Sequence, residues 1–199
     1  KSIYPILAAI TAGVYAGIPL ADIVSSLENL PPTRERLEPI LLANGAYLLD
    51  DSYKSTPDTV YEAYEVLKEI PGKRRWIVMG HLNNTPTADW GVYCQAVGEK
   101  MADAADYVVL VGEHSEEYLI GLKRRNFPLD RIWSFSTTAE VTSLLEAYLG
   151  EGDVVLIKAH EDQGLRRSVL ALRDKRQTRC SVKFCRLHDQ FCDDCPLLY

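Results

Sequence analysis

The sequence predicts an α/β fold: a Rossmann-like, mostly parallel sheet with helices on both faces, preceded by a short helical segment and followed by a cysteine-rich tail. First, short apolar runs alternate with amphipathic stretches from residue 55 onward, which is typical of right-handed βαβ units. Second, those runs are apolar throughout, as expected of parallel strands that are covered on both faces. Third, Pro31 and Pro32 interrupt the chain before this pattern, and four of the five cysteines lie in the last twenty residues.

The first 32 residues predict two helices, Ile6–Ala16 and Leu20–Leu30, joined by a Gly17-Ile18-Pro19 turn. The stretch from Ile3 to Ala21 is uncharged and about as long as a membrane span, but its prolines and glycine break the helical pattern. It also continues into amphipathic sequence without a change of character, which argues against a signal peptide. We therefore expect a buried core helix rather than a membrane span or a signal peptide. We place a boundary or hinge at Pro31-Pro32, because neither proline continues a helix.

Residues 37–50 predict a β-hairpin, because Asn44-Gly45 in its middle tolerates the positive φ angles of a tight turn. Thr56 is placed to cap a helix whose first residue is Pro57, and Pro71-Gly72 ends that helix. The apolar side chains on one face of this helix are Val60, Ala63, Tyr64 and Leu67.

The elements expected in the rest of the alternating region are assigned from the length of each stretch. Apolar runs of four or five residues predict buried strands, and longer amphipathic stretches predict helices. In order, the expected elements are strand Trp76–Met79, helix Trp90–Ala104, strand Tyr107–Val111, helix Ser115–Arg124, strand Ile132–Phe135, helix Ala139–Leu149, strand Val154–Lys158 and helix Leu165–Leu172. Such sheets bind ligands beyond the carboxyl ends of their strands. This points to residues 50–54, 80–84, 112–114 and 158–162.

Composition excludes several classes of protein. The 199 residues are 47% hydrophobic and 25% charged, which is ordinary for a globular protein and unlike a disordered or fibrous chain. The net charge of −6 provides no basic field for nucleic acid, so neither nucleic acid nor a membrane is an expected partner.

The polar residues at the expected strand ends are candidates for binding. Asp50 and Asp51 are expected to follow a strand, where a carboxylate suits the hydroxyls of a ribose, and Lys54 suits a phosphate or carboxylate. The alternative is a solvated loop whose Asp and Ser residues serve turns and the helix cap. His81, His114 and His160 also follow strand ends and either line one crevice or serve as surface or capping residues.

The chain carries a series of motifs in a fixed order: Leu7-Ala8-Ala9-Ile10, Gly17-Ile18-Pro19-Leu20, Glu35-Arg36-Leu37-Glu38, Asp50-Asp51-Ser52-Tyr53 with Pro57-Asp58, Pro71-Gly72-Lys73-Arg74 before Ile77-Val78-Met79-Gly80, and Val154-Val155-Leu156-Ile157-Lys158. In this order they resemble the C-terminal half of a Mur ligase over about residues 5–173. The Asp-Asp-Ser-Tyr and Pro-Asp motifs are most similar to the branch that adds D-alanyl-D-alanine to a UDP-muramoyl-tripeptide. The Asp-Asn-Pro-Arg motif of the diaminopimelate-adding branch is absent.

The resemblance implies an ATP-dependent amide ligase of peptidoglycan precursor synthesis, acting in the cytoplasm with ATP and Mg²⁺. Its implied partners are a UDP-muramoyl-peptide and an amino acid or dipeptide such as D-alanyl-D-alanine. Residues 1–32 are expected to be the helical end of a missing central ATPase domain, 33–173 the C-terminal Rossmann-like domain, and 174–199 the tail. No phosphate-binding G-x-x-x-x-G-K-[ST] loop occurs in these residues, so we expect the isolated chain to be inactive.

By motif position, the resemblance assigns Arg36 and Asp51 to the nucleotide. It assigns five further residues to the amine substrate: Ser52, Lys54, His81, Lys158 and His160. Three motifs depart from the family pattern: Tyr-Asn-Ala-Asn reads Tyr53-Lys54-Ser55-Thr56, Gly-Asp reads Gly80-His81, and Lys-Gly-Ser-Arg reads Lys158-Ala159-His160-Glu161. The alternative function is therefore a Mur-ligase-like binding or scaffold protein that has lost catalysis and gained a cysteine-rich metal module.

The tail contains Cys180, Cys185, Cys192 and Cys195. The last two have the Cys-x2-Cys spacing of a metal knuckle, and four thiolates suit a tetrahedral zinc site. An iron–sulfur cluster, disulfides and packed thiols are the alternatives.

Overall fold

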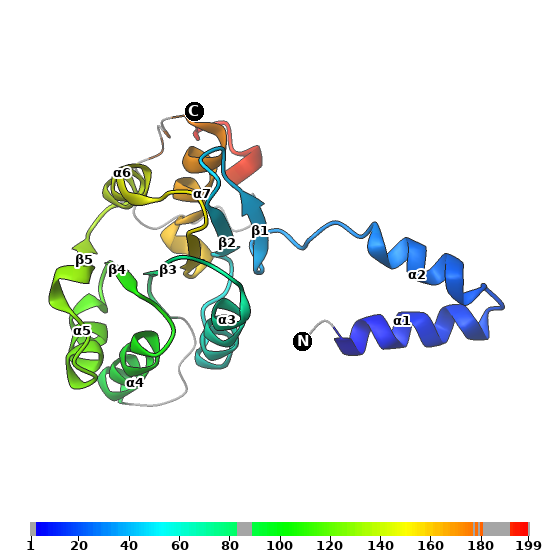
Figure 1. Ribbon diagram of the computed structural model, residues 1–199, viewed down its shortest axis with the longest axis horizontal. Helices are drawn as coiled ribbons and strands as arrows, with labels where there is room; N and C mark the ends of the chain where they lie inside the picture. Colours follow the sequence, from blue (N-terminus) through cyan, green and yellow to red (C-terminus); the bar gives the residue numbers. More distant parts are fainter. Residues whose placement is uncertain (1–2, 83–88, 177, 179, 181–191, 199) are drawn as a thin grey trace. The chain divides into compact units, whose positions relative to one another are not determined.

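The computed structural model describes residues 3–82, 89–176, 178, 180 and 192–198. The chain divides into two compact units, Lys1–Pro32 and Thr33–Tyr199. The first unit is a pair of helices, and the second contains the sheet (Figure 1).

The first unit consists of α1 (Ile3–Tyr15) and α2 (Leu20–Glu28). A Cβ atom added to Gly13 would lie 2.8 Å from Ile23 Cδ1, so the glycine allows the two helices to approach closely. The expectation of a buried core helix is wrong within this unit, because α1 buries none of its residues. Two helices alone have too little surface to cover an apolar face. No helix in the described part of the chain is both long and apolar enough to span a membrane.

The second unit is built on a six-stranded sheet (Figure 1). Its spatial order is β1-β2-β6-β3-β4-β5. β1 pairs antiparallel with β2, and every other neighbouring pair is parallel. The strands are β1 (Glu38–Leu41), β2 (Tyr47–Asp51), β3 (Arg75–Met79), β4 (Tyr107–Val111), β5 (Ile132–Phe135) and β6 (Val154–Lys158). This arrangement confirms the predicted fold class.

Helices cover both faces of the sheet and form two separate cores (Figure 1). The helices of this unit are α3 (Pro57–Glu69), α4 (Trp90–Ala102), α5 (Ser115–Arg124), α6 (Thr138–Tyr148) and α7 (Arg166–Asp174). α3, α4 and α5 pack their apolar sides on one face, and α6 and α7 pack on the other. Consecutive side chains of each buried strand therefore point into different cores, which is why these strands are apolar throughout.

Local signals in the sequence explain where the elements begin and turn. At the tip of the β1–β2 hairpin, Gly45 has a φ of 82°, and the Ala46 N–H donates to Asn44 Oδ1 at 3.1 Å. α6 begins with a capping box, in which the Thr137 N–H donates to Glu140 Oε2 at 3.0 Å and the Glu140 N–H donates to Thr137 Oγ1 at 3.3 Å.

Asp50 and Asp51 correct one expectation about the hairpin. Both lie inside β2 instead of after it, because β6 pairs alongside as far as Lys158, opposite Asp51. Parallel pairing thus extends the strand through two charged residues. Their carboxylates therefore project from the backbone of a sheet and not from a loop.

Candidate functional site

The candidate site lies at the carboxyl ends of three neighbouring strands, β2, β6 and β3. The segments that follow these strands are joined by backbone hydrogen bonds: the Glu161 N–H donates to Tyr53 O at 3.0 Å, and the Gly80 N–H donates to Lys158 O at 2.8 Å. Segments far apart in the sequence therefore form one continuous edge, which is where open α/β sheets bind ligands.

A buried ion pair, Lys158 with Asp51, stands at the centre of this edge. Lys158 Nζ lies 2.8 Å from Asp51 Oδ2, and the lysine side chain has no exposed surface. The same ammonium donates to the backbone carbonyl of Lys54. Burial lowers the pKa of Lys158 and raises the pKa of Asp51, and the attraction between the two charges opposes both shifts. Lys158 thus holds both the carboxylate and the loop after β2 in place.

The other residues predicted to bind ligand on this loop differ in exposure. Arg36 is exposed, and its guanidinium carbon lies 4.5 Å from the centre of the Tyr53 ring, a cation–π contact. The positive charge of Arg36 also acts on Asp51 and lowers its pKa, in part offsetting the effect of burial. Lys54 is exposed, whereas Ser52 is buried. The structure therefore brings Arg36 beside Asp51, and both of their proposed roles toward a nucleotide stay predictions.

His81 and His160 meet at the same edge, together with Asp162. His81 Nε2 lies 2.9 Å from Asp162 Oδ1, and His160 Nδ1 lies 2.8 Å from the same oxygen. Burial lowers the pKa of His81, although the attraction of Asp162 opposes this shift. Of the residues that the structure describes, these three form the group whose side chains are close enough to share a metal ion.

Gln163 fixes the backbone around the two histidines. Its Oε1 accepts from the His81 N–H at 2.9 Å, and its Nε2 donates to Val111 O at 2.8 Å. A Cβ atom on Gly80 would lie 1.9 Å from Gln163 Oε1, so only glycine leaves room for this bridge. The third strand-end histidine is not part of the group, since His114 lies against Trp90, whose Nε1 is 2.7 Å from His114 Nε2.

Sequence reasoning pointed to residues 158–162 but assigned no role to Asp162, and it missed Gln163. The available signal was their spacing, because both follow His160 within three residues on a segment that leaves a strand. In a tight turn, a carboxylate two residues after a histidine is able to reach the imidazole ring. The 3₁₀ turn Glu161–Gln163 brings the Asp162 carboxylate to the ring of His160 in this way.

A second charged cluster, also missed, surrounds Arg166 at the start of α7. The guanidinium is buried and contacts four carboxylates, of which Asp193 accepts two hydrogen bonds at 2.9 Å. Its other acidic partners are Glu35, Glu38 and Asp50. Arg166 thereby ties the described part of the tail to β1, β2 and the segment before them.

Four carboxylates surround Arg166, and of these Asp193 also lies 3.6 Å from Arg173 Nη1. Burial and the excess of negative charge act together on Glu35. Burial first, and then the charge of Asp50, raise the pKa of Glu35 to about 7. Because the folded state holds this proton more tightly than the unfolded chain, the contribution of Glu35 to stability falls as the pH rises from about 4.5 to about 7.

The predicted metal ligands in the tail are only partly covered, because Cys185 lies outside the described residues. Cys180 accepts from Arg167 Nη1 through its carbonyl at 2.8 Å and its sulfur at 3.4 Å. Among the described residues, no tail cysteine belongs to a close group of three or more metal-ligating side chains. Zinc at the tail therefore stays a prediction. The disulfide alternative is wrong for Cys180 and Cys195, which are free thiols in the structure.

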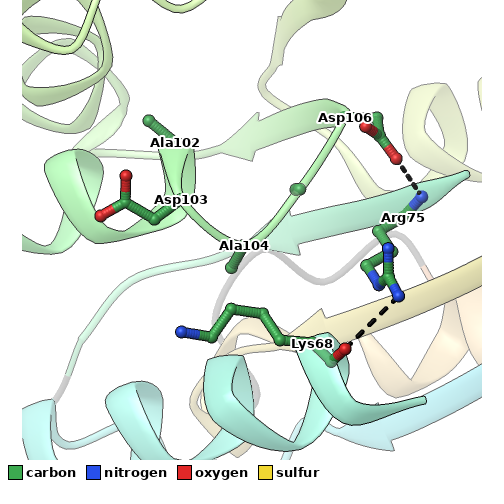
Figure 2. A pocket seen from close by; sticks show the side chains of 7 residues that line it. Lys68, Arg75, Ala102, Asp103, Ala104 and Asp106 are labelled. Atoms are coloured by element: carbon green, nitrogen blue, oxygen red, sulfur yellow. Dashed lines mark hydrogen bonds between the residues drawn. The ribbon is translucent and has the colours of Figure 1, made fainter.

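A hollow of about 280 Å³ lies at the opposite, amino edge of the sheet, next to Lys68, Arg75 and Asp106 (Figure 2). Its polar groups already pair with one another: the Arg75 N–H donates to Asp106 Oδ2 at 2.8 Å, and Arg75 Nη2 donates to Lys68 O at 3.3 Å. This hollow is therefore separate from the candidate site, since it lies at the other ends of the strands.

Comparison with known proteins links residues 35–161 to the family model described as Mur ligase, glutamate ligase domain. The UDP-N-acetylmuramoyl-tripeptide–D-alanyl-D-alanine ligase of Bacillus subtilis is 24% identical over 164 residues, which are 82% of this chain and 36% of that protein. The enzyme of the same name from Escherichia coli is 34% identical over 109 residues, 55% of this chain and 24% of that protein.

Solved structures share the fold. A crystal structure of MurF from Acinetobacter baumannii has a TM-score of 0.71 at 23% identity, covering 85% of this chain and 37% of that one. The structure of MurF ligase from Thermotoga maritima in complex with ADP has a TM-score of 0.64 at 19% identity, covering 83% of this chain and 36% of that one. The chain thus spans roughly a third or less of the length of the curated relatives named here.

Proposed function

Because this chain belongs to the Mur ligase family through its glutamate ligase domain, we propose that it is the C-terminal nucleotide- and amine-substrate-binding part of an ATP-dependent amide ligase of peptidoglycan precursor synthesis. In such a reaction a substrate carboxylate takes the γ-phosphoryl group of ATP and releases ADP. An amine then attacks the acyl carbon, forms the amide bond and releases phosphate.

The observation that carries the proposal is the Asp51–Lys158 pair beside Arg36, inside the segment that matches the family. Lys158 keeps a negative charge on Asp51 at the carboxyl edge of the sheet, where that carboxylate is able to accept hydrogen bonds from ribose hydroxyls. The exposed guanidinium of Arg36 lies near Asp51 and is proposed to bind the phosphates of the nucleotide. The contact between Arg36 and the Tyr53 ring limits the motion of the guanidinium.

For the amine substrate, we propose a site formed by Ser52, Lys54, His81 and His160, with Lys158 holding the loop between them. Positive and hydrogen-bonding groups at this edge suit the carboxylate of an amino acid or dipeptide. The names of the Bacillus subtilis and Escherichia coli relatives support D-alanyl-D-alanine as the amine and a UDP-muramoyl-tripeptide as the acid. These precursors are made in the cytoplasm, which is where the proposed reaction takes place.

ATP and Mg²⁺ belong to this proposal through a central domain that supplies a phosphate-binding loop. Mg²⁺ would offset the negative charge of the transferred phosphoryl group. In the proposed enzyme, the carboxylate of Asp51 and the guanidinium of Arg36 belong to the C-terminal domain and position the nucleotide. We therefore propose that the isolated chain binds the nucleotide but does not hydrolyse ATP.

A chimera tests the proposal. We expect residues 33–199, in place of the matching domain of the Bacillus subtilis ligase, to support ADP release that requires UDP-muramoyl-tripeptide, D-alanyl-D-alanine and Mg²⁺ together. Arg36→Ala should lower kcat/KM for ATP about tenfold or more, since a hydrogen bond to a charged group contributes ~1.5–3 kcal/mol. Coupled measurement of ADP gives the rates.

Arg34→Ala is the matched control, because Arg34 is an exposed arginine whose pair with Asp194 at 3.5 Å is too exposed to matter for stability. Equal loss in both variants would argue against a nucleotide role for Arg36. A folded chimera that releases no ADP with any amine would favour the alternative, a non-catalytic binding or scaffold protein.

A further inference from the structure

Three potential metal ligands come together at the carboxyl edge of the sheet from two different strand ends. His81 follows β3, and His160 and Asp162 follow β6. One ligand atom from each of the three side chains lies within 4.8 Å of the others. All three side chains retain some exposed surface, between 14% and 29%. We propose that His81, His160 and Asp162 bind a divalent transition-metal ion of the zinc type.

The contacts around Asp162 Oδ1 are the main argument for a cation. This oxygen lies 2.8–2.9 Å from two imidazole nitrogens, yet it is shielded from solvent and accepts no hydrogen bond of acceptable geometry. His160 Nδ1 is itself an acceptor, because the Asp162 N–H donates to it over a long distance of 3.5 Å. Two acceptors this close repel each other unless a positive charge lies between them, and an ion bound to all three atoms supplies one.

The ligand set selects the kind of metal. Two imidazoles and one carboxylate are typical of catalytic zinc sites and of other first-row transition-metal sites that keep a position for a further ligand. Mg²⁺ instead prefers oxygen ligands and keeps most of its water. The group therefore favours Zn²⁺ or Co²⁺ over Mg²⁺, and it is separate from the tail cysteines.

The backbone that carries the ligands is held in place before any ion binds. Gln163 bridges the His81 N–H and Val111 O, and Gly164, with a φ of 70°, closes the 3₁₀ turn that carries Asp162. Such support is what a metal site needs, because its ligands must be fixed to a fraction of an ångström. Both histidines also stand where the motifs depart from the Mur ligase pattern. They belong to the edge proposed for the amine substrate, so an ion bound here would lie within that proposed site.

Co²⁺ titration of the metal-free chain, with its four tail cysteines replaced by serine so that they cannot bind the ion, tests the proposal. We expect one Co²⁺ ion to give the visible bands of a nitrogen- and oxygen-liganded site without thiolate charge-transfer bands, and Zn²⁺ but not Mg²⁺ to displace it. His81→Asn and His160→Asn should each weaken binding about tenfold or more, since even residues that only orient a ligand cost that much. His114→Asn is the matched control, a strand-end histidine outside the group.

X-ray absorption of the Zn²⁺-loaded chain and circular dichroism of each variant complete the test. The site is supported if the bound metal has only nitrogen and oxygen neighbours. Metal binding should also be lost in folded His81→Asn and His160→Asn and kept in His114→Asn. Binding that is unaffected by both substitutions, or no binding at all, would each overturn it. If His160→Asn does not fold, Asp162→Asn provides the same comparison from the more exposed ligand.

Discussion

Replacing Lys158 by methionine is expected to lower the free energy of unfolding by about 3–5 kcal/mol, the typical cost of removing one partner of a buried ion pair. Methionine fills much of the volume of the lysine stem but leaves the buried carboxylate of Asp51 without its counter-ion and the Lys54 carbonyl without its donor. The main loss is therefore electrostatic and not a packing loss. Urea unfolding followed by circular dichroism measures it.

Two comparisons isolate this cause. The double variant Lys158→Met with Asp51→Asn removes the uncompensated charge and should recover part of the loss. Lys68→Met, which breaks the exposed pair of Lys68 with Glu65, should change stability by less than ~1 kcal/mol. If Lys158→Met and Lys68→Met cost the same, the buried pair does not organise this edge as we describe.

Arg166→Met is expected to have a comparable effect, about 3–5 kcal/mol, because it leaves several buried carboxylates without a positive charge. It should also release the described part of the tail, since Asp193 is held by two hydrogen bonds from this guanidinium. Limited proteolysis should then cleave near Asp193 at a protein concentration and pH where the parent chain is resistant. Chemical denaturation at pH 8 measures the loss of stability.

Glu35→Gln separates charge from packing in this cluster. It should stabilise the chain at pH 8 and flatten the decrease in stability between pH 4.5 and 7, because it removes the carboxylate whose pKa is raised to about 7. An Arg166→Met variant that stays protease-resistant would show that Arg166 does not hold the tail. A Glu35→Gln variant with unchanged pH dependence would show that the pKa of Glu35 is not raised in the folded chain.

The sequence is sufficient to predict most of the sheet and the helices that cover it, because the signals are local. The apolar runs of β3, β4 and β6 need only their composition to be recognised, and Asn44-Gly45 marks its own turn. The end of β2 is not a local property. Asp50 belongs to the strand because both β1 and β6 pair with it, and Asp51 belongs to it because β6 does.

The same distinction applies to the candidate site. His81, His160, Asp51 and Lys158 are predictable as strand-end residues, since parallel strands end at one edge. That Lys158 is fully buried against Asp51, or that Arg166 meets four acids, depends on packing between distant segments, which no spacing in the sequence encodes. For α1, apolar composition predicted burial, but within its own two-helix unit none of its residues is buried.

The central claim is that the edge around Asp51 and Arg36 binds a nucleotide, and a titration of the ¹⁵N-labelled chain with ADP tests it most directly. Two-dimensional NMR should show concentration-dependent shifts confined to the residues around Arg36, Asp51 and Tyr53. Weak binding suffices, because the shifts report where the nucleotide binds and not only how tightly. Shifts confined to the hollow near Lys68 and Arg75 at the opposite edge, or no shifts at millimolar ADP, would contradict the claim.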